Sequence, residues 1–219
     1  MQKSLIAFSG LDGAGKSTQI DLLIEYYKNS GSKVYYFWSR GGYTPGIQYF
    51  KKCMRRFNST KIPINQGHSK ERDKSFSNPL IRKVWLSLAI IDLIFFYVIY
   101  LRYKSYNGFK IICDRYIFDT SLDFRLNFPQ ENVRNWLLWK LMLFFAMKPH
   151  KHFILTIPVK ESLKRSKLKN EPFPDSEETL SSRLSHYLSS AHQCSKIIHI
   201  NGAESINKIH KFIIVQLNQ

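Results

Sequence analysis

The stretch Ser9–Thr18, which reads SGLDGAGKST, decides the fold of this chain. It contains the pattern G-x-x-x-x-G-K-S, whose glycines let backbone N–H groups turn inward around phosphate oxygens. A short apolar segment at residues 3–8 precedes it, and residues 16–29 follow with the apolar spacing of a helix. A strand before the pattern and a helix after it are the context that a P-loop requires. The stretch therefore predicts a nucleoside-triphosphate site.

Two side chains of this loop have defined expected roles. Lys16 should reach the β- and γ-phosphates, and the Ser17 hydroxyl should ligate Mg²⁺. The N-terminus of the following helix adds positive potential at the same place. ATP and Mg²⁺ are therefore the expected cofactors. The expected ATP-binding residues are Gly10, Asp12, Gly13, Ala14, Gly15, Lys16, Ser17 and Thr18.

Beyond the loop, short apolar strands alternate with helices, and no hairpin signal appears. This order predicts an α/β fold of the three-layer P-loop NTPase type, with a five-stranded parallel sheet wrapped by helices. We expect a single domain over residues 1–219, with a lid segment at about residues 165–178. After the first strand and helix, strands are predicted at 34–38, 109–114, 152–157 and 196–201, helices at 46–57, 132–147, 160–167, 176–193 and 203–217, and a polar loop at 58–78.

The third predicted strand ends in an acid and a base. The sequence is ICDRY, and Asp114 stands where a Walker-B-type carboxylate would face the metal. Arg115 follows, and a guanidinium fork can hold a transferable phosphate with two hydrogen bonds. A surface ion pair at a strand end is the alternative interpretation of these two residues.

Further cations are expected around the same edge of the sheet. Arg40 follows the second strand and precedes two glycines, so its backbone could approach a ligand closely. Residues 162–169 form a basic helix end before an acidic, proline-containing loop. Arg165, Lys167 and Lys169 are the candidates that could close over the nucleotide and neutralise transition-state charge. A solvated basic helix is the alternative for this segment.

Charge and cysteine content limit the other function classes. Lys and Arg outnumber Asp and Glu by 33 to 16, which gives a net charge of +17. Such a surface attracts phosphates, nucleic acid or anionic lipid, although a merely solvated basic surface has the same composition. The three cysteines are far apart and odd in number, which predicts neither a disulfide framework nor a metal site. No signal peptide is apparent, and we expect a cytoplasmic protein.

One apolar run is long enough to raise the question of a membrane span. Residues 84–101 read VWLSLAIIDLIFFYVIYL, which meets the lower length limit for a span. Asp92 near its centre argues against that, because an acid at mid-bilayer costs about 2.5–3.5 kcal/mol even on insertion scales. The run also lies between two strands of the predicted sheet. We therefore expect no membrane span, but a buried crossover helix that could also contact a partner in a homodimer.

These features together resemble thymidylate kinases, within the P-loop nucleoside monophosphate kinases. The similarity covers essentially the whole chain and includes GLDGAGKST, the arginine after the second strand, ICDRY, a basic lid and the C-terminal IHINGA. It implies transfer of the ATP γ-phosphoryl group to a nucleoside monophosphate such as dTMP. It also implies that Asp12 lies near the acceptor's sugar, that Arg40 and Arg115 hold its phosphate, and that Asp114 supports the metal. Some members carry a catalytic arginine where this chain has Gly13, so the resemblance assigns that role to the lid.

The departures from the family fall on the acceptor side. The family's acid after the arginine of the second strand is missing beside Arg40, and its Ala-Tyr after ICDRY is absent. Its helix reading Phe-Ala-Ala-Asp-Arg, which stacks on and reads thymine, corresponds here to residues 89–93, AIIDL. The stacking and reading positions are therefore Ala89 and Leu93. A lost stacking ring should cost about 1–3 kcal/mol of base binding.

Three hypotheses follow. The first is a nucleoside monophosphate kinase similar to thymidylate kinase, with a nucleotide and a small-molecule acceptor as its ligands. The second is a P-loop kinase for a different small acceptor, such as a sugar, a sugar phosphate or another metabolite. The third is an ATPase stimulated by nucleic acid, which we do not expect because the chain has no interleaved basic and aromatic motif.

Overall fold

The computed structural model describes residues 4–39, 76–169, 175–189 and 197–219. Within these ranges five strands form one parallel sheet in the order β2-β3-β1-β4-β5. The central strand β1 pairs with β3 on one side and β4 on the other, so that Phe8 lies beside both Asp114 and Phe153. The predicted fold class is confirmed. The strands are β1 (Leu5–Gly10), β2 (Val34–Trp38), β3 (Lys110–Asp114), β4 (Lys151–Thr156) and β5 (Ile197–Asn201).

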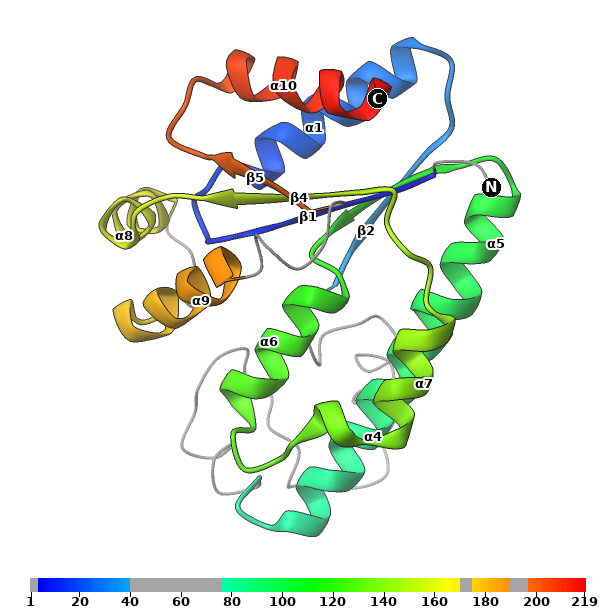
Figure 1. Ribbon diagram of the computed structural model, residues 1–219, viewed down its shortest axis with the longest axis vertical. Coiled ribbons are helices and arrows are strands. Elements are labelled where there is room, and N and C mark those ends of the chain that lie inside the picture. Colours follow the sequence, from blue (N-terminus) through cyan, green and yellow to red (C-terminus); the bar gives the residue numbers. More distant parts are fainter. Residues whose placement is uncertain (1–3, 40–75, 170–174, 190–196) are drawn as a thin grey trace.

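Helices cover both faces of the sheet (Figure 1). On one face α1 (Lys16–Asn29) and α10 (Ile206–Asn218) lie side by side. On the other face lie α4 (Pro79–Ile94), α5 (Leu101–Tyr106), α6 (Ile117–Asn127) and α7 (Leu137–Phe145). Two further helices, α8 (Val159–Leu168) and α9 (Glu177–Ser189), pack against each other.

Alternation along β1 and β3 assigns their apolar side chains to two core clusters. Leu5, Ala7 and Cys113 point toward the α4 side, whereas Ile6, Phe8 and Ile112 point toward the other side. Successive side chains of a strand face opposite ways, so these nearly continuous apolar strands fill both layers. The polar groups at the strand ends are thereby left at one edge, where ligands of parallel sheets bind.

The long apolar run is a helix of the folded domain. Asn78 caps it by accepting hydrogen bonds from Leu80 N and Ile81 N, and Pro79 occupies its first turn. A π-helical segment, η1 (Phe95–Tyr100), joins α4 to α5, which makes one helix of 28 residues from Pro79 to Tyr106. This helix is long and apolar enough to cross a membrane, but it contributes Leu86, Ile90 and Leu101 to the core beside the sheet.

The outer face of this helix is also apolar. Val84, Ile91, Phe95 and Ile99 are each about half exposed, at 51%, 51%, 49% and 57%. Their spacing places them along one side of the helix, and we call this set the apolar stripe. The prediction of a buried helix therefore holds for one face only.

One predicted element is wrong. The sequence pattern predicted a single helix over residues 132–147, but the chain forms a short 3₁₀ helix, η2 (Val133–Asn135), followed by α7. Trp136 separates them in an extended conformation, with ψ of 139°. The break separates Val133 from Trp139 along the chain, and both are buried in the same apolar cluster. The predicted helix 46–57, most of the predicted loop 58–78 and Arg40 lie outside the described residues.

Candidate active site

The P-loop joins the end of β1 to the start of α1. Gly10 has φ of +138°, and a Cβ there would lie 2.0 Å from the carbonyl oxygen of Leu155 on β4, so no larger residue fits. Lys16 is buried, and its Nζ donates to the carbonyl oxygens of Gly10 (3.0 Å) and Leu11 (2.8 Å). Burial and the neighbouring Arg115 lower the pKa of Lys16, although Asp12 and Asp114 act in the opposite direction.

Other P-loop residues fit the arrangement expected from sequence. Gly15 caps α1 with φ of +92°, and Ser17 and Thr18 are exposed in the first turn of that helix. Ala14 is buried, and its N–H donates to the carbonyl oxygen of Leu11 at 3.2 Å. The loop thus presents a helix N-terminus and two hydroxyls to the edge of the sheet.

Asp114 lies at the end of β3, beside the P-loop strand. Its Oδ2 accepts a hydrogen bond from the hydroxyl of Tyr36 on β2 at 3.3 Å. Its Oδ1 is buried and has no hydrogen-bond partner among the described residues. An orphaned buried carboxylate oxygen needs a partner, and Mg²⁺ or a metal-bound water supplies one. Asp114 therefore fits the metal-supporting role that the sequence predicts.

The metal site would rest on few protein ligands. No group of three or more His, Cys, Asp or Glu side chains able to hold a metal occurs in the described part of the chain. Magnesium in phosphoryl-transfer enzymes is held by one or two protein ligands, waters and the substrate phosphates. Asp114 and the Ser17 hydroxyl would suffice for such a site, and the metal would supply charge neutralisation on the phosphates.

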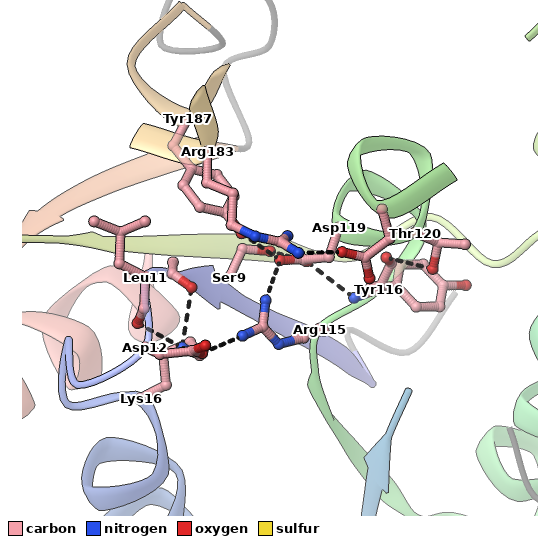
Figure 2. A network of polar contacts seen from close by, with 12 residues as sticks. Ser9, Leu11, Asp12, Lys16, Arg115, Tyr116, Asp119, Thr120, Arg183 and Tyr187 are labelled. Carbon is pink, nitrogen blue, oxygen red and sulfur yellow. Dashed lines mark hydrogen bonds and ion pairs between the residues drawn. The ribbon is translucent and has the colours of Figure 1, made fainter. Parts of the chain in front are cut away.

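Arg115 is the centre of an ion cluster (Figure 2). It adopts φ of +69°, an uncommon conformation for a residue other than glycine, and its side chain is buried. Its Nη2 contacts Asp12 Oδ1 at 2.5 Å, and its Nη1 lies 3.6 Å from Asp119 Oδ1. Burial would lower the pKa of Arg115, but Asp12, Tyr187 and Asp119 outweigh it and raise that pKa well above the ordinary value.

Most of the residues behind Arg115 were not among the predicted site residues. Asp119 is fully buried and accepts hydrogen bonds from the Ser9 hydroxyl, from Tyr116 N (3.2 Å) and from the Tyr187 hydroxyl (2.8 Å). The Ser9 hydroxyl also contacts His152 Nε2 at 2.7 Å. A signal for Asp119 existed, because an acid four residues after an arginine at a helix start can pair with it. The sequence held no comparable local signal for Tyr187 or His152.

The start of the predicted lid lies against the P-loop. Arg165 on α8 donates from Nη1 to the carbonyl oxygens of Gly13 (3.2 Å) and Gly202 (3.3 Å), and its Nε donates to Glu161. A Cβ at Gly13 would lie 2.8 Å from Arg165 Cβ, so the absent side chain at Gly13 makes room for Arg165. Lys167 and Lys169 are exposed. Of the three lid candidates, Arg165 is therefore the one that reaches the P-loop.

Ala89 and Leu93 belong to the apolar core. Both are fully buried in the apolar cluster between α4 and the sheet. Their part in acceptor binding stays a prediction, as do the roles of Arg40 and of the lid. The structure thus brings together Lys16, Asp12, Asp114, Arg115 and Arg165 at or beside the P-loop.

Comparison with known proteins gives an independent result. No protein-family model matches the chain. A probable thymidylate kinase of Pyrococcus horikoshii is 27% identical over 216 residues, which are 98% of this chain and 95% of that protein. The thymidylate kinase of Desulfotalea psychrophila is 26% identical over 222 residues, covering 98% and 94% of the two chains. That of a Sulfurihydrogenibium species is 23% identical over 222 residues, covering 98% and 96%.

The similarity runs along the whole chain, although the identity is low. It agrees with the parallel five-stranded sheet flanked by helices. The chain is thus similar to thymidylate kinases over its whole length, and sequence, fold and relatives together indicate an enzyme similar to the P-loop nucleoside monophosphate kinases.

Proposed function

We propose that this protein transfers the γ-phosphoryl group of ATP to a nucleoside monophosphate. The observation that carries the proposal is that two buried cations, Lys16 and Arg115, both lie beside the carboxylate of Asp12. Asp12 Oδ1 lies 3.9 Å from Lys16 Nζ and contacts Arg115 Nη2. One cation belongs to the triphosphate side and the other to the acceptor side, so two phosphate groups would meet between them.

The residues divide the reaction between them. Lys16 binds the β- and γ-phosphates, and Asp114 with Ser17 supports Mg²⁺. Arg115, together with Arg40, holds the acceptor phosphate in line with the γ-phosphoryl group. Arg165 is held beside the P-loop backbone, where it can neutralise charge that develops on the transferred group. Exclusion of water by the lid suppresses hydrolysis of ATP.

A different small acceptor is the second candidate, and one observation favours it. Ala89 and Leu93 are fully buried, so α4 offers neither a stacking ring nor a polar reader at these positions. A site that hydrogen-bonds a base discriminates strongly, whereas an apolar site discriminates weakly. We therefore expect dTMP to be a poor acceptor or one of several.

An acceptor screen tests both candidates. The purified protein is assayed for ADP release from Mg-ATP with dTMP, dUMP, UMP, CMP and a panel of sugars and sugar phosphates. Phosphorylation of a nucleoside monophosphate supports the proposal, and phosphorylation of a sugar alone supports the second candidate. Turnover of dTMP at ordinary kinase rates would refute the inference from Ala89 and Leu93. ADP release that needs no acceptor but rises with nucleic acid would favour an ATPase.

We also propose a homodimer through the apolar stripe. Further apolar side chains are exposed on α7, which packs against α4: Leu137, Phe144 and Phe145. Exposed apolar surface of this extent is characteristic of interaction sites. Thymidylate kinases are commonly dimers, and the second copy is the partner that the resemblance implies. Sedimentation equilibrium should give twice the chain mass, and Phe95→Asp should give the monomer; a monomeric wild type would contradict the proposal.

A further inference from the structure

Arg115 contacts two carboxylates that differ in their freedom to move (Figure 2). The side chain of Asp12 is 17% exposed, and it belongs to the P-loop. That of Asp119 is fully buried on α6. Without a bound phosphate, the single positive charge of Arg115 therefore faces two carboxylates, those of Asp12 and Asp119. A dianionic acceptor phosphate could bind Arg115 only if one of these carboxylates gave way.

The contacts of Asp119 show which carboxylate stays. Three donors from three different elements converge on it: Ser9 at the end of β1, the backbone of Tyr116, and Tyr187 on α9. A buried carboxylate with three donors is held in place, because moving it would break three hydrogen bonds at once. Asp12 is shared between Arg115 and Lys16, and its side chain is partly exposed.

We propose that Asp119 is a positioning residue that aims Arg115 at the acceptor phosphate, and that Asp12 is the exchangeable partner which this phosphate displaces. The carboxylate of Asp12 would occupy the phosphate's place on Nη2 while the acceptor site is empty. Once displaced, it is available to accept a hydrogen bond from a hydroxyl of the acceptor. This inference rests on the proposed acceptor-phosphate role of Arg115.

Asp119 also links Arg115 to α9, the helix that follows the lid. Tyr187 and Arg183 lie one turn apart on α9, and they contact Asp119 and Asp123, one turn apart on α6. Arg183 also binds Asp175 at 2.8 Å, just before α9 begins. Asp123 therefore joins the same two helices as Asp119 through its ion pair with Arg183 and acts on Arg115 as a neighbouring charge, which makes it the matched control for a structural role and for a lost negative charge.

The two carboxylates should have opposite effects on phosphate binding. The protein is saturated with Mg-ADP to occupy the P-loop, and inorganic phosphate is titrated by calorimetry. Asp119→Asn should weaken phosphate binding about tenfold, a loss typical of removing an outer supporting contact. Asp12→Asn should strengthen it, because the amide neither competes for the guanidinium nor repels the anion. Asp123→Asn should change the affinity less than Asp119→Asn does, because the carboxylate of Asp123 pairs with Arg183.

Several results would overturn the inference. These are wild-type binding of phosphate in the Asp119 variant, weaker binding in Asp12→Asn, or no phosphate site in the wild type. Asparagine cannot accept from all three donors, so Asp119→Ser, which removes the charge with a smaller side chain, is measured alongside it and must agree. A shared loss in the Asp119 and Asp123 variants would show a structural role only. If the phosphate pattern holds while no monophosphate is phosphorylated, the proposed function fails and the inference stands.

Discussion

The region around the P-loop, which we call the phosphate end, and the long helix α4 differ in the side chains that they bury. At the phosphate end, charged side chains are buried and each is held by contacts with named partners, as for Lys16 and Arg115. In α4 the positions that would read an acceptor base, Ala89 and Leu93, are apolar and belong to the core. The residues proposed for phosphoryl transfer and the positions predicted to read the acceptor therefore lie in different parts of the core, so that each set can be tested by substitution separately.

The largest expected effect lies at the phosphate end. Lys16→Ala should lower kcat by about 10³-fold or more, because it removes the buried cation that stabilises charge on the transferred group. Lys28→Ala is the matched control, since Lys28 is exposed in the last turn of the same helix. Initial rates of ADP release measure both. Wild-type activity in the Lys16 variant would contradict the proposed role of Lys16 in binding the triphosphate.

The next effect lies in α4 and concerns stability. Leu93→Ala should lower the free energy of unfolding by about 2–5 kcal/mol, because a fully buried leucine leaves a cavity. Leu80→Ala, at a position 71% exposed in the first turn of α4, should cost far less. Urea unfolding gives both values. A Leu93 variant as stable as the Leu80 variant would mean that α4 keeps Leu93 for a ligand rather than for the core.

A third effect concerns the neutral imidazole behind the phosphate end. Burial lowers the pKa of His152 to about 4, from an ordinary value near 6.5. The unfolded chain therefore takes up the proton first, and this contribution to stability is present above pH 6.5 and lost as the pH falls toward 4. The full contribution of His152 to the free energy of unfolding is about 3 kcal/mol.

Replacing this imidazole isolates its share of the acid sensitivity. In His152→Gln the free energy of unfolding should fall less steeply between pH 6.5 and 4 than in the wild type. The comparison of slopes removes the contribution of the carboxylates, which both proteins share. Parallel curves for the two proteins would show that His152 is not kept neutral by the fold.

The smallest expected effect tests the contact between α8 and the P-loop. Arg165→Ala should lower kcat by about 10- to 100-fold, less than the loss of Lys16, because Arg165 is one of several cations around the transferred group. Arg165→Lys should recover part of the rate, since it restores the charge without the planar fork. Lys164→Ala, an exposed neighbour on α8, is the control. Equal rates in the Arg165 and Lys164 variants would assign the lid cation elsewhere.

The sequence allowed the fold to be predicted because its strongest signals are local. The glycine and lysine pattern of the P-loop requires a strand before it and a helix after it, and short apolar strands without hairpin turns leave only a parallel arrangement. The break at Trp136 could not be foreseen, because apolar residues continue on both sides of it and only the packing of Val133 and Trp139 reveals it.

The site was foreseen where its residues stand in a motif and missed where they meet through space. Lys16 and Asp114 have expected positions at the end of a strand or the start of a helix. Asp119, His152 and Tyr187 come from α6, β4 and α9, and only the sheet and helix packing brings them together. The partial exposure of the apolar stripe could not be predicted either. Periodicity shows which residues share a face of a helix, but it does not show what covers that face.

The close approach of Gly13 and Arg165 has a consequence for how this chain can change. A methyl group at position 13 and the side-chain stem of Arg165 would claim the same volume. Position 13 therefore cannot take a side chain while Arg165 keeps its place against the P-loop, and any residue added there would have to push α8 away from the loop.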